Sequence, residues 1–280
     1  VLAEDVGGVP DVHLSVWDVA FADPASAASR NARALGIEPA TDALHAVRGA
    51  DLVISAVTAA NDLTAARSAA AGMAAGTWFL DLNSAAPGQK QDAAEVVEHA
   101  GGRYVEAAVM SPLMPKRLAA PMLLGGPHTA DFVGFAGPLG FTGLEPYADT
   151  VGPASATKLC RSVMIKGVEA LLTESMLAAR DWGVEGRVLA SLTNLLPSDD
   201  WEALAAYMIS RSLEHGARRA EEMREAAATV AATGIEPLMS DAIARRQDWA
   251  AGHRDAADDK ALRPMLDAIR AQLSGEGTRS

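Results

Sequence analysis

The sequence predicts an α/β domain built on a mostly parallel sheet, followed by an all-helical domain. Over the first half of the 280 residues, short and nearly continuous apolar runs alternate with Ala-rich helical segments. This alternation is typical of strands that are covered on both faces by helices. In the second half, apolar residues recur at helical spacing instead. We therefore predict a Rossmann-type domain over residues 1–150 and a helical domain over residues 151–280.

Five segments of the first half have the composition of strands, and glycine or proline marks the limits of the helices between them. The predicted strands are Val12–Asp18, Asp51–Val57, Thr77–Leu82, Arg103–Val109 and Pro121–Leu124. The predicted helices are Ala25–Leu35 before Gly36, Asn61–Ala75 before Gly76, and one that begins near Pro87. Strands and helices of these lengths imply βαβ units.

The second half predicts a succession of helices. They are Ser155–Asp181, Arg187–Leu195, Asp199–Glu214, Ala217–Thr233, Pro237–Ala251 and Lys260–Leu273. We interpret Asp199 and Asp200, which precede Trp201, as a helix N-cap and not as metal ligands. Because long apolar helix faces are usually buried against another copy, we expect a homodimer.

Composition excludes several classes of protein. The formal charge of −12 argues against a general nucleic-acid binder, since neutralising phosphates requires clustered Lys and Arg. The single cysteine, Cys160, excludes an internal disulfide framework and fits a reducing compartment. We find no apolar run of membrane-spanning length, no signal-peptide pattern and no pattern of metal ligands. We therefore expect a cytoplasmic protein that binds no metal and no membrane.

Polar residues follow three of the predicted strands, where ligands of parallel sheets bind. They are Asp18, Val57–Thr58 and Asn83–Ser84. An acid at the end of the second strand of a dinucleotide fold accepts hydrogen bonds from the ribose hydroxyls and repels a 2′-phosphate, which favours NAD over NADP. The alternative for Asp18 is an ordinary turn, since Asp begins many turns.

The glycine-rich pyrophosphate loop, G-x-G-x-x-G, does not occur in the sequence, and Gly7–Gly8 does not match it. In a dinucleotide fold the acid follows that loop by about 20 residues, whereas only 17 residues precede Asp18. Because the rest of the βαβ pattern is intact, we expect the sequence to begin after the first strand. The alternative is a protein that binds no dinucleotide.

Lys158 lies at the predicted domain junction, in the segment Gly152–Ser162 that opens the helical half. Only five of the basic residues are lysines. A lysine here is suited to a role that arginine does not fill, which is the exchange of a proton. Because small-molecule sites form preferentially at domain junctions, we interpret Lys158 as a candidate general acid or base. The alternative is a lysine on a helix surface.

Four features resemble motifs of the β-hydroxyacid dehydrogenases, a family that includes 3-hydroxyisobutyrate and 6-phosphogluconate dehydrogenases. Asp18 stands where family members carry an acid or polar residue after strand two. Asp81–Pro87 resembles D-x-S-T-x-x-P, and Glu106–Pro112 resembles D-A-P-V-S-G-G. Ala154–Ser162 resembles G-x-x-x-K-x-x-x-N, with its glycine displaced to Gly152. The resemblance covers nearly the whole chain and is strongest to a phosphogluconate-dehydrogenase-like branch.

The resemblance implies an oxidoreductase that transfers a hydride between NAD, or NADP, and a 3-hydroxy acid or sugar acid. Lys158 would exchange the hydroxyl proton. The other site residues that it implies are Ser84, Ser111, Ser162 and His215 for the substrate, and Asp18, Val57, Thr58 and Asn83 for the cofactor. The substrate itself does not carry over, because Ser111 and Pro112 replace the glycines of the family loop and Ser162 replaces an asparagine. The alternative for His215 is a solvated helix face.

Two other functions stay open at this point. Imine reductases use the same scaffold, although the position of the lysine is commonly altered in them. A catalytically silent nucleotide-sensing protein would account for the altered substrate loop and the absent glycine-rich loop. Retention of Lys158 favours the dehydrogenase over both.

Overall fold

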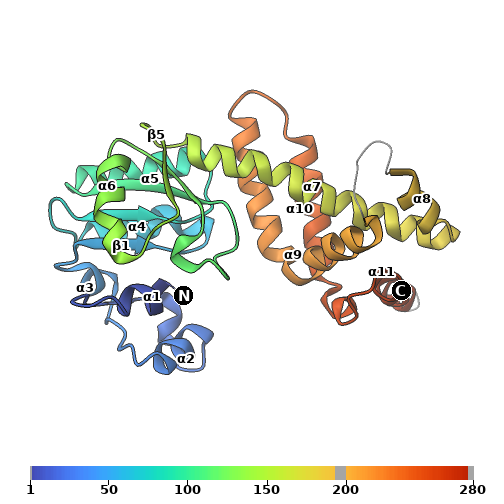
Figure 1. Ribbon diagram of the computed structural model, residues 1–280, viewed down its shortest axis with the longest axis horizontal. Coiled ribbons are helices and arrows are strands. Elements are labelled where there is room, and N and C mark those ends of the chain that lie inside the picture. The colour runs from blue at the N-terminus through green and yellow to red at the C-terminus, as the bar shows by residue number, and fades with distance from the viewer. Residues whose placement is uncertain (1, 193–199, 277–280) are drawn as a thin grey trace. The chain divides into compact units, whose positions relative to one another are not determined.

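The chain forms two compact units, Val1–Lys158 and Leu159–Ser280 (Figure 1). The structure is a computed structural model that describes residues 2–192 and 200–276. The division between the units falls inside one long helix, α7 (Pro153–Trp182). The assignment of cofactor binding to residues 1–150 and of dimerisation to residues 151–280 stays a prediction.

The first unit is built on a mostly parallel sheet, as predicted, and the sheet has five strands. Its strands are β1 (Leu52–Ser55), β2 (Trp78–Asp81), β3 (Arg103–Val109), β4 (Met122–Gly125) and β5 (Leu144–Ala148), in that spatial order. The strand Leu144–Ala148 is not among the predicted ones. Only β3 and β4 run antiparallel to each other. All four residues of β2 are buried, which explains why this strand has no polar alternation.

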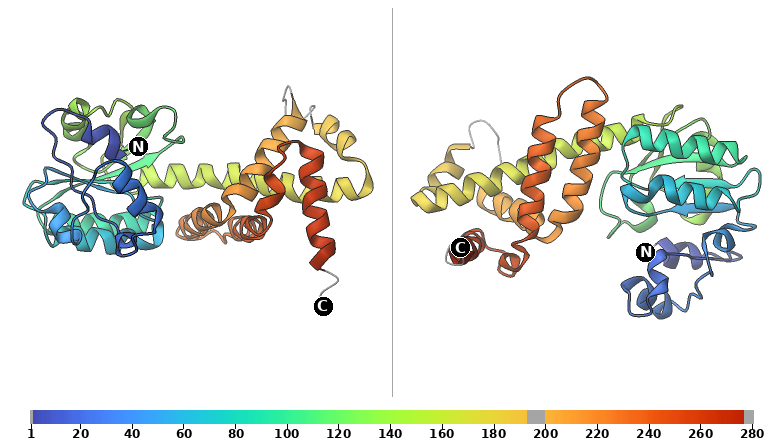
Figure 2. Two further views of the ribbon diagram at one scale, coloured as in Figure 1. Left: turned by 90° about the horizontal axis from the view of Figure 1, so that it is seen from below. Right: turned by 180° about the vertical axis from the view of Figure 1, so that it is seen from behind.

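Helices cover both faces of this sheet. One face carries α3 (Ala43–Val47), α4 (Asp62–Ala70) and α5 (Pro87–His99), which bury small side chains against Phe79 and Tyr104. Figure 2 shows α4 and α5 side by side over that face. The other face packs against α1 (Leu2–Gly7) and α6 (Thr129–Ala136). Apolar packing on both faces accounts for the continuous apolar runs of the sequence.

The predicted strand Val12–Asp18 is wrong. Only Val16 makes a strand-like bridge, to Pro39, and the bridge stands alone. Proline has no N–H to donate, so the ladder does not continue there. Asp18 instead begins a short 3-10 helix (Val19–Ala22), whose Ala20 N–H donates to the Asp18 carboxylate at 2.8 Å.

The second unit is helical throughout, as predicted. After α7 come α8 (Glu185–Leu192), α9 (Trp201–Ala231), α10 (Leu238–Ala251) and α11 (Leu262–Glu276). None of the helices in the described ranges is both long and apolar enough to span a membrane. Asp200 is the N-cap of α9 and accepts the Ala203 N–H at 2.8 Å, which confirms its predicted role. The predicted cap residue Asp199 and the predicted helix end at Leu195 lie outside the described residues.

The two predicted helices Asp199–Glu214 and Ala217–Thr233 are one helix, α9. Gly216 is not a helix breaker there but a point of close contact with α10. A Cβ at this position would lie 2.4 Å from the carbonyl oxygen of Gln247. Glycine therefore allows the two helix backbones to approach, and α9 and α10 lie side by side (Figure 1).

Candidate functional site

The carboxyl ends of β1 and β2 are joined by the side chain of Asn83. Its Oδ1 accepts the backbone N–H of Val57 at 2.6 Å. Its Nδ2 donates to Ser55 Oγ at 2.9 Å and to Asp62 Oδ1 at 2.7 Å. One buried amide therefore fixes the turn after β1 to the turn after β2, which brings together two of the predicted cofactor-binding positions.

Asp81, the last residue of β2, accepts a hydrogen bond from Asn83 and forms a fully buried ion pair with Lys90. Its Oδ1 lies 2.6 Å from Lys90 Nζ, and neither side chain is accessible to solvent. The same oxygen accepts the Asn83 N–H at 2.9 Å, while Oδ2 accepts the Tyr104 hydroxyl at 2.7 Å. Burial alone would raise the pKa of Asp81, but the charge of Lys90 and the hydrogen bonds lower it below its ordinary value. Asp81 is therefore kept charged by Lys90 and by the hydrogen bonds that it accepts.

Asp62 stands next to this pair and has the opposite tendency. Burial and the neighbouring charge of Asp81 raise its pKa to about 7, against the attraction of Lys90. Its Oδ2 is buried and meets no hydrogen-bond donor in the part of the chain that the structure describes. A proton on the Asp62 carboxyl group would be shared with Asp81, so the two carboxyl groups form an unequal acid and carboxylate pair.

Lys158 reaches the same edge of the sheet from the start of α7. Its Nζ donates to Ser84 Oγ at 2.6 Å, and both side chains are partly buried. Ser84 follows Asn83 directly, so Lys158 contacts the residue next to a predicted cofactor-binding residue. The structure thus brings together Lys158, Ser84, Asn83 and Val57 within one unit.

The first turn of α7 is held by Glu106 of β3. The Glu106 carboxylate accepts the Gly152 N–H and the Ser155 N–H, each at 2.7 Å. Glu106 is inaccessible to solvent. Ser155 Oγ donates to the Gly152 carbonyl at 2.9 Å and closes the turn.

Two further predicted residues of the first unit lie in exposed or half-buried turns. Thr58 is exposed, and its Oγ1 accepts the Asn61 side-chain amide at 2.9 Å. Ser111 is half-buried, and its hydroxyl donates to the neighbouring Pro112 carbonyl at 3.1 Å. Neither interaction ties the side chain to Lys158.

Ser162 and His215 belong to the second unit. Ser162 is buried and accepts a hydrogen bond from Lys166 Nζ at 3.0 Å. His215 Nε2 lies 2.6 Å from Arg211 Nη1. Burial and the nearby Arg211 and Arg218 charges lower the pKa of His215, which favours a neutral imidazole that accepts from Arg211.

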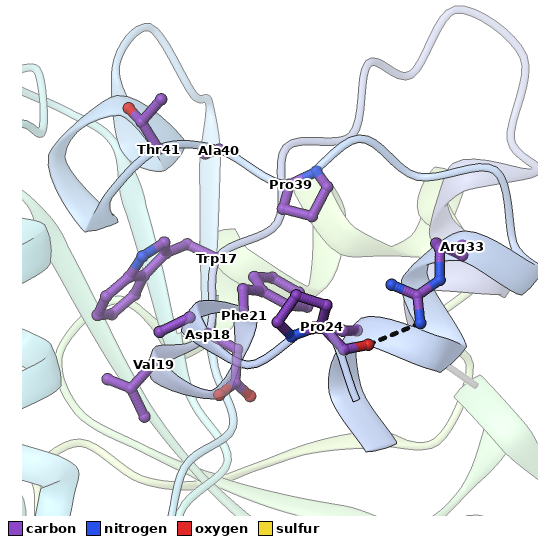
Figure 3. Close-up of a pocket in the computed structure, with 11 residues that line it drawn as sticks. Trp17, Asp18, Val19, Phe21, Pro24, Arg33, Pro39, Ala40 and Thr41 are labelled. Carbon is purple, nitrogen blue, oxygen red and sulfur yellow. Dashed lines mark hydrogen bonds between the residues drawn. The ribbon is translucent and has the colours of Figure 1, made fainter. Parts of the chain in front are cut away.

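Asp18 lies in a pocket of about 550 Å³ on the first unit. Figure 3 shows the rings of Trp17, Phe21 and Pro39 at this pocket, with Arg33 at its side. The Arg33 Nη2 donates to a backbone carbonyl at 2.7 Å. The volume is within the range of small-molecule sites. Asp18 therefore has apolar walls around it although its predicted strand does not form.

Sequence reasoning missed Lys90, Asp62, Tyr104 and Glu106 as parts of this site. Lys90 carried no signal in the sequence, because it lies among the polar residues Gln89, Gln91 and Asp92 near the start of its helix. Glu106 appeared only as the first letter of a motif. Their roles depend on contacts between residues far apart in the chain, which periodicity does not show.

Two family models match the sequence. Residues 11–130 match the NAD binding domain of 6-phosphogluconate dehydrogenase. Residues 179–250 match a domain of unknown function, DUF1932. No curated protein matched the sequence.

Solved structures resemble the chain over nearly its whole length. A conserved hypothetical protein from Sinorhizobium meliloti is 35% identical, with 98% of this chain and 94% of that chain covered and a TM-score of 0.74. The conserved protein MTH1747, reported as similar to 3-hydroxyacid dehydrogenases, is 28% identical over 90% of this chain and 92% of that chain, with a TM-score of 0.67. The Mycobacterium tuberculosis 3-hydroxyisobutyrate dehydrogenase shares the fold at 18% identity, with 97% of this chain and 94% of that chain covered and a TM-score of 0.68.

Proposed function

The chain belongs to the β-hydroxyacid dehydrogenase family, and from this premise we propose that it transfers a hydride between a nicotinamide dinucleotide and a 3-hydroxy acid or sugar acid. The observation that carries the proposal is the contact between Lys158 Nζ and Ser84 Oγ at 2.6 Å. It sets a group able to exchange a proton beside the strand ends where dinucleotides bind in such sheets.

The residues present fit a dinucleotide. The pocket around Asp18 has aromatic and proline walls from Trp17, Phe21 and Pro39, which suit an adenine ring. The exposed Asp18 carboxylate would accept hydrogen bonds from the ribose hydroxyls and would disfavour a 2′-phosphate, so we propose NAD as the preferred cofactor. The nicotinamide ring supplies the hydride chemistry when it is bound. Val57, Thr58 and Asn83 would contact the bound cofactor along the carboxyl ends of the strands.

Lys158 would take the hydroxyl proton of the substrate during oxidation and return it during reduction. The Ser84 hydroxyl holds the ammonium group in place through its oxygen lone pair. Ser84, Ser111, Ser162 and His215 are proposed to bind the carboxylate and hydroxyls of the substrate. Of these, Ser84 accepts a hydrogen bond from Lys158.

Replacement of Lys158 by methionine tests this function. We expect turnover to fall by about 10²–10⁴-fold, the usual contribution of a general acid or base, while cofactor affinity stays unchanged. The matched control is Lys260→Met, which removes an exposed lysine paired with Glu214 and should leave turnover intact. Near-normal turnover in Lys158→Met would exclude the proposed role of this lysine.

We further propose that the chain assembles as a homodimer through its second unit. Several large apolar side chains of its helices are exposed, among them Met164, Leu171, Leu238 and Met239. Met164 and Leu171 are seven residues apart on α7 and therefore share one helix face. A molar mass twice that of the chain in light scattering, reduced to one chain by Leu171→Glu, is the expected result.

A further inference from the structure

Helix α7 cannot cap its own N-terminus. Its N-terminal flank is Gly152, whose φ is +124°. Side chains rarely adopt this conformation, so Ser, Thr, Asp and Asn, which usually cap helices, are excluded there. The backbone N–H groups at the start of α7 must therefore find an acceptor elsewhere in the molecule.

Glu106 supplies that acceptor from the middle of the sheet. Its two oxygens accept the N–H groups of Gly152 and Ser155, at 2.7 Å each. In an ordinary capping box two different side chains satisfy these two positions. Here one buried carboxylate does both. The negative charge also faces the positive end of a 30-residue helix.

The strand next to Glu106 leaves room for its carboxylate. Gly125 of β4 is its registered partner in the sheet. A Cβ on Gly125 would lie 2.3 Å from Glu106 Oε2. The position of the carboxylate is thus set by the backbone of β3 and β4, which are central elements of the first unit.

We propose that Glu106 is a positioning residue that sets Lys158 for proton exchange. Lys158 is the sixth residue of α7, and its Nζ bonds Ser84 at the end of β2. Glu106 fixes the first turn of the helix to β3, and β3 is paired with β2 from Arg103 to Glu106. The distance from Lys158 to Ser84 therefore depends on this cap. The inference rests on the proposed function only in its effect on turnover.

Substitution of Glu106 by glutamine or by aspartate separates the effect of its negative charge from the effect of its side-chain length. A glutamine has one acceptor oxygen, and its amide group would face one of the two N–H donors, so Glu106→Gln breaks at least one of the two bonds. Glu106→Asp keeps both acceptor oxygens but is shorter by one methylene group. We expect the aspartate variant to retain part of what the glutamine variant loses.

The experiment measures Lys158 directly. The full chain is labelled with ¹³Cε-lysine, and the Lys158 resonance is identified by its absence in Lys158→Met. Its chemical shift and the pH at which it titrates are then compared in the wild type, Glu106→Gln and Glu106→Asp. The control is Glu98→Gln, since Glu98 also accepts a backbone N–H, that of Tyr104, at 2.9 Å.

We expect a changed shift and titration of Lys158 in Glu106→Gln, a smaller change in Glu106→Asp, and none in Glu98→Gln. Turnover of Glu106→Gln should fall by about 10²-fold, the cost of misplacing a reacting group by about 1 Å, with unchanged cofactor affinity. An unchanged Lys158 resonance in a folded Glu106→Gln or Glu106→Asp protein would overturn the proposal. The resonance answers this question even if Lys158→Met shows that the lysine is not the catalytic group.

Discussion

Each unit of the molecule contains a buried ion pair, but the two pairs belong to different hydrogen-bond networks. In the first unit Asp81 and Lys90 are both inaccessible to solvent. In the second unit Arg219 bonds Glu169, with side-chain exposures of 8% and 2%. The first pair continues through Asn83 to the turns at the strand ends. The second continues through Gln247 of α10, whose side-chain amide donates to Glu169 and to the Lys166 carbonyl of α7.

The two pairs also differ in how completely their polar atoms are satisfied. Asp81 uses both carboxylate oxygens, and its pKa is lowered. Burial raises the pKa of Glu169 more than Arg219 and Lys166 lower it. Arg219 Nε and Gln247 Oε1 have no partner among the described residues. We propose that the first pair supports the proposed cofactor site, whereas the second joins helices.

The largest effect is expected from Lys90→Met. It leaves the Asp81 carboxylate buried without its cation, which costs about 3–5 kcal/mol of unfolding free energy. The turn at Asn83 is held by the same carboxylate, so cofactor affinity should fall as well. Urea unfolding and fluorescence titration with NADH measure the two effects. Unchanged cofactor affinity in a folded variant would remove the link between this pair and the site.

A smaller effect is expected from Arg219→Met. Because burial already raises the pKa of Glu169, this carboxyl group takes up a proton when its partner is lost, and the cost falls to about 1–3 kcal/mol. Cofactor affinity should not change. Urea unfolding at two pH values tests this, since the loss should shrink at the lower pH. A loss of NADH affinity equal to that of Lys90→Met would show that both ion pairs support the cofactor site.

Asp62→Asn is expected to change the pH dependence of stability. The pKa of Asp62 is raised from its ordinary value to about 7, so between these values the folded state binds more protons than the unfolded state. Stability therefore decreases as the pH rises through this window. Asparagine mimics the protonated acid, so the variant should gain stability relative to the wild type between pH 5 and pH 8, by about 1–3 kcal/mol.

The control for this comparison is Asp131→Asn. Asp131 is an exposed acid in the first turn of another helix, α6. It reproduces any loss of attraction to the helix dipole without removing a buried acid. The midpoints of urea unfolding at pH 5 and pH 8 are compared for the two variants and the wild type. Parallel behaviour of the Asp62 and Asp131 variants would contradict the raised pKa.

The smallest effect concerns the choice of cofactor. Asp18→Asn removes the charge that disfavours a 2′-phosphate, and the preference for NADH over NADPH should fall by about tenfold, or 1.4 kcal/mol. Asp23→Asn is the matched control, since Asp23 also accepts a backbone N–H, that of Ala25, at 2.8 Å. Separate titrations with the two cofactors measure the ratio. A ratio that moves equally in both variants would remove Asp18 from cofactor recognition.

Features that depend on neighbouring residues could be predicted from the sequence, whereas contacts between distant residues could not. The buried strands and the helical half follow from hydrophobic patterns, which are local. The position of Lys158 near the start of a long helix could be predicted, because glycine and helix signals surround it. Val12–Asp18 failed because strand formation needs a partner, and Pro39 ends the pairing. The predicted break between Glu214 and Ala217 was wrong, because Gly216 is in close contact with another helix and such a glycine cannot be told by sequence from one that ends a helix.

The polar network behind the site was beyond sequence reasoning. Asp62 and Asp81 are 19 positions apart in the chain, and Glu106 bonds a backbone 46 positions away. Nothing in the spacing of these residues indicates that they meet. Their burial beside one another is set by the sheet register, which pairs Asp81 with Glu106 across β2 and β3.

Titration of the full chain with NADH and NADPH tests the central claim most directly, followed by a screen of 3-hydroxy acids and sugar acids for reduction of the preferred cofactor. Tryptophan fluorescence reports binding, since Trp17 lines the pocket around Asp18. We predict saturable binding, stronger for NADH, and turnover with at least one acid that is lost in Lys158→Met. Binding of neither cofactor would contradict the dehydrogenase function, and binding without turnover on any acid would contradict its hydroxy acid chemistry.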